Sequence, residues 1–159
     1  MFVNRKNWKT YAFWIGITEL VGLLAGLFTR QSTEIYSQTI TKPPLSPPAL
    51  VFPIVWTILY ALMGISAARI RLTPGSPSQQ RATNLYLIQL VVNFFWPLFF
   101  FNLQVFGFSF AWLILLWVLV VLLTFTSYKV DPLAAWLLVP YLIWLTFAAY
   151  LNAGVWVLN

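Results

Sequence analysis

Residues 82–128 form an unbroken run of 47 positions without Asp, Glu, Lys or Arg. A helix that spans a bilayer needs roughly 20 apolar residues, so this run is long enough for two such helices. The rest of the chain follows the same pattern, because 61% of the 159 residues are apolar, 19% are aromatic and only 8% are charged. We therefore expect an all-α integral membrane protein whose functional groups lie within the bilayer.

The uncharged runs predict a bundle of five transmembrane helices in a single domain, residues 1–159. Two helix starts have clear signals, since Ser46 and Asp131 each place a capping side chain before a first-turn proline. The polar segment at 102–104 is expected to break the long uncharged run in two. The predicted spans cover about residues 8–28, 47–68, 81–101, 107–128 and 132–158.

The basic residues are distributed unevenly between the two ends of this bundle. Seven of the nine Lys and Arg residues fall in the N-terminus and the second and fourth loops, and only Arg30 and Lys42 fall on the other side. The positive-inside rule then predicts a cytoplasmic N-terminus and an external C-terminus. The net charge of +6 is thus explained by membrane orientation, and we expect no nucleic-acid partner.

The chain contains neither cysteine nor histidine. This excludes disulfides, thiol chemistry, the usual His/Cys zinc sites and imidazole acid–base catalysis. We accordingly expect no metal site, no required cofactor and no catalytic residue.

Three prolines lie inside the predicted spans, and each is close to a tryptophan. A proline within a helix leaves the carbonyl four residues earlier without its backbone donor. In lipid this is tolerated only where neighbouring groups or water satisfy that carbonyl. The three sites are either ordinary kinks or, taken together, the walls of a shaped cavity. They pair Pro53 with Trp56, Pro97 with Trp96, and Pro140 with Trp144.

Helical spacing gathers aromatic and amide side chains onto one face of each of three spans. Buried amides normally face the bundle interior, because lipid offers them no partner. The pattern fits interhelical packing with amides as hydrogen-bonding contacts. It fits equally well an aromatic-lined pocket for a flat apolar ligand. The faces comprise Trp56 and Tyr60; Asn93, Trp96 and Phe100; and Trp144, Ala148 and Asn152.

The first span carries an acid and a pair of glycines. Glu19 is the one acid placed within a span, and such groups are costly and often functional. It is expected either to relay protons or contact a ligand cation, or to be neutral and hydrogen-bonded to Thr18 or Gln89; we favour the neutral structural role. Gly22 and Gly26 form a G-x-x-x-G step, which predicts close contact with another helix.

Four blocks of the sequence resemble the TspO/MBR family, the tryptophan-rich sensory proteins of bacteria and the translocator protein of mitochondria. The blocks follow the family's order and spacing across almost the whole chain. They are KPPLSPP at 42–48, WTILYALMG at 56–64, NFFWPLFF at 93–100 and VPYLIWLTFAAYLN at 139–152.

The resemblance implies a five-helix bundle, often a homodimer, with a pocket closed by the first loop. We separately expect the protein to lie in a bacterial cell membrane. Members of the family bind porphyrins such as protoporphyrin IX and haem, and some bind sterols or synthetic isoquinoline and benzodiazepine ligands. The matching pocket positions are Trp56, Asn93, Trp96, Trp144, Ala148 and Asn152, and the loop over the pocket contains Lys42, Pro43, Pro44 and Leu45.

The chain departs from the family pattern at four places. Leu45 replaces a loop tryptophan that the family links to light-dependent porphyrin breakdown, so this activity is not expected. The segment 151–157 lacks the tyrosine and basic residue of the weak cholesterol-recognition pattern. Asn84 and Ile88 replace small residues of a common dimer contact, and Trp112 occupies an acidic position of the fourth span.

The sequence therefore favours a membrane protein that binds tetrapyrroles and acts as a sensor. The alternatives are a transporter of porphyrins, sterols or other apolar solutes and, ranked last, a porphyrin-degrading enzyme. Because haem iron would lack its commonest protein ligands here, we expect free-base porphyrin to bind at least as well as haem.

Overall fold

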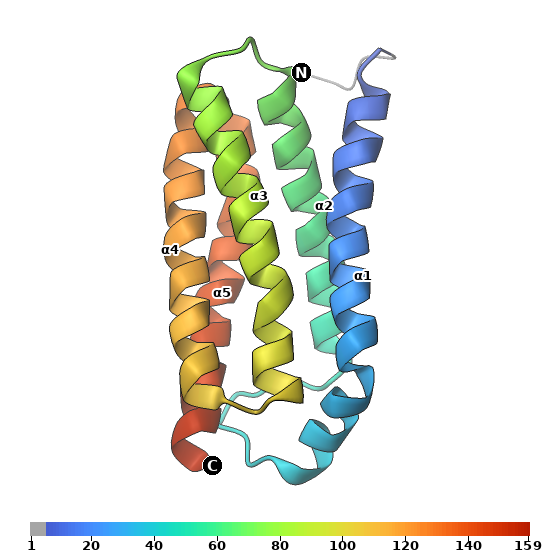
Figure 1. Cartoon of the computed structure of the whole chain (residues 1–159), viewed down its shortest axis with the longest axis vertical. Coiled ribbons are helices and arrows are strands. Elements are labelled where there is room, and N and C mark those ends of the chain that lie inside the picture. The colour runs from blue at the N-terminus through green and yellow to red at the C-terminus, as the bar shows by residue number, and fades with distance from the viewer. Residues whose placement is uncertain (1–5) are drawn as a thin grey trace.

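The computed structural model describes residues 6–159 and is helical through most of that range. Five of its helices are long and apolar enough to cross a membrane, as the sequence predicts, and they run side by side along the long axis (Figure 1). The elements are α1 (Trp8–Thr39), α2 (Val51–Leu72), α3 (Pro77–Pro97), the short π-helix η1 (Leu98–Asn102), α4 (Phe106–Val130) and α5 (Pro132–Leu158).

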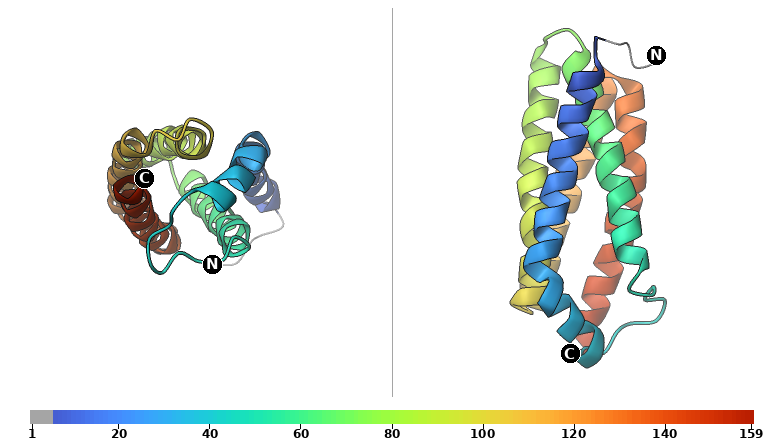
Figure 2. Two further views of the ribbon diagram at one scale, coloured as in Figure 1. Left: turned by 90° about the horizontal axis from the view of Figure 1, so that it is seen from below. Right: turned by 90° about the vertical axis from the view of Figure 1, so that its right-hand side faces the viewer.

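The helices form a closed ring around a common core. Seen from one end, the order around the ring is α1, α2, α5, α4 and α3, and each of these helices packs on its two neighbours (Figure 2). Met63, Tyr86 and Tyr141 fill the centre and are almost fully buried. The ring therefore places the aromatic faces of α2, α3 and α5 toward one another.

The first connection differs from its prediction. Helix α1 continues to Thr39, well past the predicted end near residue 28. The polarity of this part of the chain predicts a loop, but Thr29 and Thr33 donate to the carbonyls of Ala25 and Thr29, so their hydroxyls are satisfied within the helix. The connection is correspondingly short, and we call residues 40–50 the strap.

Helix α2 begins at Val51, and the predicted start at Pro47 is wrong. The hydroxyl of Ser46 donates to the carbonyl of Pro43, within the strap, and caps no helix. Pro53 consequently lies in the first turn of α2, where a missing N–H costs nothing, so the predicted kink at this residue is also wrong.

The other predicted boundaries hold more closely. Asp131 caps α5 by accepting from the backbone N–H of Leu133, as predicted. Helix α3 starts at Pro77, four residues before the predicted Arg81, because Ser76 accepts from the N–H of Gln79 and so caps an earlier turn. The chain breaks after Asn102, as expected.

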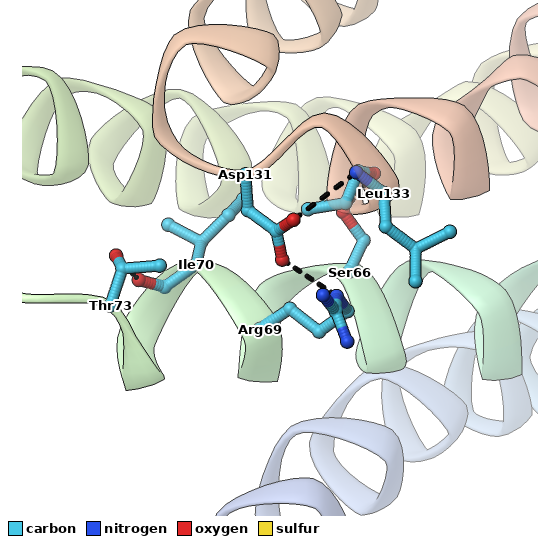
Figure 3. A network of polar contacts seen from close by, with 7 residues as sticks. Ser66, Arg69, Ile70, Thr73, Asp131 and Leu133 are labelled. Atoms are coloured by element: carbon cyan, nitrogen blue, oxygen red, sulfur yellow. Dashed lines mark hydrogen bonds and ion pairs between the residues drawn. The ribbon is translucent and has the colours of Figure 1, made fainter. Parts of the chain in front are cut away.

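One ion pair joins the ends of α2 and α5 that lie opposite the strap (Figure 3). The Nε atom of Arg69 donates to the Asp131 carboxylate over 2.6 Å, and Ser66 donates to the carbonyl of Ala134 over 2.7 Å. Asp131 thus caps its own helix and neutralises a cation of the neighbouring helix at once. These contacts fix the axial position of α5 relative to α2. They therefore also fix the height of Trp144 relative to Trp56 along the bundle.

The predicted glycine contact in α1 is half right. A Cβ atom added to Gly22 would collide with the ring of Tyr60, whereas one added to Gly26 would meet nothing within 4 Å. The second close contact comes from α2, since a Cβ on Gly64 would lie 2.5 Å from the Cα of Ile15. Glycines from both helices therefore let α1 and α2 approach closely.

Candidate functional site

The strap crosses the end of the bundle where α1 and α5 end and α2 begins (Figure 2). Thr41 and Asn159 exchange two hydrogen bonds, of 3.1 and 2.8 Å, between the strap and the end of α5. The Tyr150 hydroxyl donates to the carbonyl of Pro44 over 2.7 Å, and buried Pro43 packs directly on Gly154. The strap is thus attached to the last turns of α5 at three levels.

The four predicted loop residues have different surroundings. Pro43 and Pro44 line an apolar groove of about 380 Å³ on α5, together with Tyr150, Ala153, Gly154, Val157 and Leu158. The ammonium group of Lys42 donates to the carbonyl of Ser37, at the end of α1. Leu45 is 81% exposed and has a positive φ of 69°, a strained backbone for a branched residue. The structure therefore places the prolines on α5 and leaves Leu45 at the tip of the strap.

Inside the strap, a continuous line of aromatic rings leads from α5 to α2. Successive ring centroids lie 6.2, 5.6, 6.4 and 5.3 Å apart, within the range of favourable aromatic contacts. The ring of Phe52 closes on Trp144 from the start of α2 at 5.8 Å. We call the line the aromatic row; in order it comprises Tyr150, Phe147, Trp144, Trp56 and Tyr60.

Trp144 is the member of the row whose unused polar group is buried. Its indole N–H is buried and has no hydrogen-bond partner among the described residues. A buried donor without a partner costs roughly 1–3 kcal/mol, so such groups are rare in native structures. An acceptor atom placed between the rings of the row would remove this cost.

Asn93 lies at the inner end of the row and links three helices. Its side-chain oxygen accepts from the Tyr60 hydroxyl over 2.8 Å, and its amide nitrogen donates to the Tyr141 hydroxyl over 2.7 Å. Tyr141 donates in turn to Gln89 over 2.8 Å. These four side chains are all buried, so the amide of Asn93 is used for packing α2, α3 and α5 together.

Asn152 organises a second group, on the far side of α5 from the strap. Its oxygen accepts from the Trp96 indole over 3.0 Å and from Ser109 over 3.2 Å, and its nitrogen donates to the carbonyl of Phe106 over 2.9 Å. Trp96 stacks on Phe100 with ring centroids 5.1 Å apart. Both predicted amides therefore act as interhelical contacts, the first of the two interpretations left open by the sequence.

The structure thus divides the predicted site residues into two groups. Trp56, Tyr60 and Trp144 lie together in the aromatic row, with Asn93 bonded to Tyr60. Trp96, Phe100 and Asn152 form the second group, and buried Ala148 lies on α5 one helical turn from Trp144 and from Asn152.

Sequence reasoning missed four side chains of this region. Phe52 and Phe147 pack on Trp144, and Gln89 and Tyr141 continue the polar chain from Asn93. All four had a usable signal, because each lies three or four positions from a predicted site residue on the same helix.

The structure also shows the surroundings of Glu19 and of Trp112. Glu19 is half-buried, and no hydrogen bond joins it to Thr18 or Gln89 within residues 6–159. Trp112 donates to the carbonyl of Val92 over 2.8 Å, so it joins α4 to α3. No group of three or more His, Cys, Asp or Glu side chains suited to a metal ion occurs in the described part of the chain.

Five helices long and apolar enough to cross a membrane, with the strap across one end of the bundle, define this chain as a polytopic membrane protein. The TspO/MBR family model matches residues 14–157, and the chain belongs to this family.

Named relatives extend over nearly the whole chain. It is 36% identical to the tryptophan-rich protein TspO of Chlorobaculum tepidum, over 97% of this chain and 98% of that one. It is 37% identical to the protein CrtK of Rhodobacter capsulatus, over 80% of this chain and 81% of that one. It is 32% identical to the translocator protein of Bos taurus, over 88% of this chain and 84% of that one.

Proposed function

We propose that this protein binds a flat, conjugated, acidic ligand of the porphyrin class along the aromatic row, beneath the strap. The observation that carries the proposal is the buried Trp144 indole N–H, which has no partner among the described residues. It lies between Phe52, Trp56 and Phe147, so an acceptor that reaches it is also surrounded by aromatic rings.

We assign the recognition of such a ligand to two interactions, stacking on aromatic rings and pairing of its carboxylates with cations. Trp56 and Trp144 meet edge to face, at an interplanar angle of 89°, and we assign these two indole rings as the stacking surfaces for a planar macrocycle. The carboxylates meet the cations at this end of the bundle, Arg30 and Lys42. The Lys42 ammonium has three donors and gives only one of them to Ser37, so two remain for a carboxylate.

Binding is the requirement that sensing and translocation share. One relative is named a tryptophan-rich sensory protein and several are named translocator proteins. A ligand site in the aromatic row serves either role, and we therefore propose only that the protein binds the ligand.

The test compares Trp144→Phe with Trp136→Phe in detergent, using protoporphyrin IX and following the absorption of the porphyrin. Trp136 is on the same helix but is 64% exposed and lies away from the row, so it provides a matched control. We expect saturable binding whose Kd rises roughly tenfold in Trp144→Phe, the equivalent of about 1.4 kcal/mol for one lost hydrogen bond. Trp136→Phe should leave the Kd unchanged.

Equal affinities of the wild-type protein and Trp144→Phe would show that the indole N–H holds no ligand atom. Binding that does not saturate would contradict porphyrin as the ligand class altogether.

We further propose that the strap faces the outside and the α2–α3 loop faces the cytoplasm. At the end of the bundle opposite the strap, the described residues include the cations Lys6, Lys9, Arg69, Arg71, Arg81 and Lys129. Arg5, which contributes to the predicted bias, lies outside the described residues. The strap end has Arg30 and Lys42, partly balanced by Glu34. The positive-inside rule applied to this distribution gives the stated orientation.

The orientation predicts that a reporter fused after Asn159 is active on the outer side of a bacterial membrane. Alkaline phosphatase, which requires export, should be active there, and green fluorescent protein should be dark. The reverse pattern of activities would contradict the proposal.

A further inference from the structure

The buried polar chain of the core ends in a group that lacks a partner. Its hydrogen bonds run in one direction, from Tyr60 to Asn93, from Asn93 to Tyr141 and from Tyr141 to Gln89. The amide nitrogen of Gln89 closes the chain, is fully buried and has no hydrogen-bond partner among the described residues. A buried N–H in that position is expensive, whereas an unpaired carbonyl oxygen is more readily tolerated.

The same atoms allow the opposite direction. Turning the amides of Asn93 and Gln89 by half a rotation exchanges oxygen and nitrogen and leaves the heavy-atom geometry almost unchanged. Gln89 then donates to Tyr141, Tyr141 donates to Asn93, and Asn93 donates to Tyr60. The unpaired donor at Gln89 disappears, and the Tyr60 hydroxyl becomes the end of the chain that needs an acceptor.

Helix α1 offers a polar group at that end. Two close contacts fix the face that α1 turns toward α2, namely Gly22 on the ring of Tyr60 and Ile15 on Gly64. Glu19 lies four residues after Ile15 and three before Gly22, so it shares this face. Glu19 is half-buried, and its carboxyl group has no hydrogen bond to another described residue, Tyr60 included.

We infer that Glu19 is the terminal acceptor of the buried chain and sets its direction, so that the Tyr60 hydroxyl donates to the Glu19 carboxyl group. An otherwise unpaired acid inside a spanning helix and an unpaired donor in the core are thereby explained by one arrangement. Glu19 becomes a positioning residue, because it fixes the Tyr60 ring that stacks on Trp56 at 5.3 Å. Any effect of Glu19 on a ligand rests on the proposed function, but the direction of the chain does not.

The direction is measurable in ligand-free protein in bilayers by solid-state NMR. With ¹⁵N in the asparagine side chains and ¹³C at the tyrosine Cζ atoms, dipolar recoupling shows which hydroxyl the Asn93 nitrogen faces. Tyr60→Phe and Tyr141→Phe assign the two contacts. We expect Asn93 Nδ2 to contact Tyr60 in the wild-type protein and Tyr141 in Glu19→Leu, where the acceptor is gone and the chain reverses.

Two further variants serve as controls for Glu19→Leu. Glu19→Gln retains an acceptor oxygen at the same place and should keep the Tyr60 contact even if Glu19→Leu fails to fold. Glu34→Leu removes the other acid of α1, which is exposed, and should also leave the Tyr60 contact in place.

A contact to Tyr141 in the wild-type protein, or the same contact in wild-type and Glu19→Leu, would overturn the assignment of Glu19. Because no ligand is present, neither result bears on porphyrin binding. Conversely, a chain direction set by Glu19 together with a failure to bind porphyrin would refute only the proposed function.

Discussion

Replacing Asn152 by leucine should lower the free energy of unfolding by about 2–3 kcal/mol. The amide holds α3, α4 and α5 together through three hydrogen bonds, to Trp96, Ser109 and the carbonyl of Phe106. Ser109 also donates to that carbonyl, so the group left without a partner is chiefly the Trp96 indole. For a chain of this size the loss corresponds to a fall in Tm of roughly 5–10 °C. Thermal unfolding in detergent, monitored by circular dichroism, measures this fall.

Asn84→Leu is the matched control for this substitution. Asn84 is exposed on α3, and its side chain accepts one hydrogen bond, from the amide nitrogen of exposed Gln80 one turn earlier. Surface changes of this kind usually stay within about 0.5 kcal/mol. Equal stability losses in the two variants would show that Asn152 is no structural junction.

The second large effect is expected for Gly64→Ala, which should destabilise the contact between α1 and α2. The added Cβ would lie 2.5 Å from the Cα and 2.8 Å from the N of Ile15, and backbone atoms cannot move aside as a side chain can. The two helices must separate, and overpacking of this kind costs about 1–3 kcal/mol. Thermal unfolding measured as for Asn152→Leu gives the loss directly.

Gly26→Ala is the same chemical change, but we predict the opposite effect on stability. Nothing lies within 4 Å of a Cβ at Gly26, so the methyl group meets no neighbour. Since alanine favours a helix over glycine by roughly 0.5–1 kcal/mol, this variant should be at least as stable as the wild-type protein. A stable Gly64→Ala, or a Gly26→Ala that is destabilised to the same degree, would contradict the assigned contact.

Much of the fold could be predicted from the sequence because charge and length are decisive in a membrane. The number of spans, the break after Asn102 and the cap at Asp131 follow from uncharged runs and turn chemistry. The end of α1 could not be predicted in this way. Its last turns are polar, and their threonine hydroxyls donate to carbonyls one turn earlier, so these side chains are satisfied within the helix and hydropathy gives no signal for where it ends.

The candidate site was predictable to the level of helix faces. Periodicity correctly gathers Trp56 with Tyr60, but it cannot tell which faces meet. The structure joins Trp144 to Trp56 and joins Asn152 to Trp96, so the predicted site residues fall into two groups. That division depends on the order of helices around the ring and on their axial level, which long-range packing determines.

We propose the Trp144 indole N–H as the donor to a porphyrin-type ligand, and the proposed function depends most on this group. The direct measurement is the ¹⁵N–¹H spectrum of indole-labelled protein as protoporphyrin IX is added, with Trp144→Phe and Trp136→Phe used to assign the two signals. We predict that the Trp144 signal moves to the position of a hydrogen-bonded indole at saturation while that of Trp136 stays in place. A Trp144 signal that does not move when the porphyrin is fully bound would contradict the account.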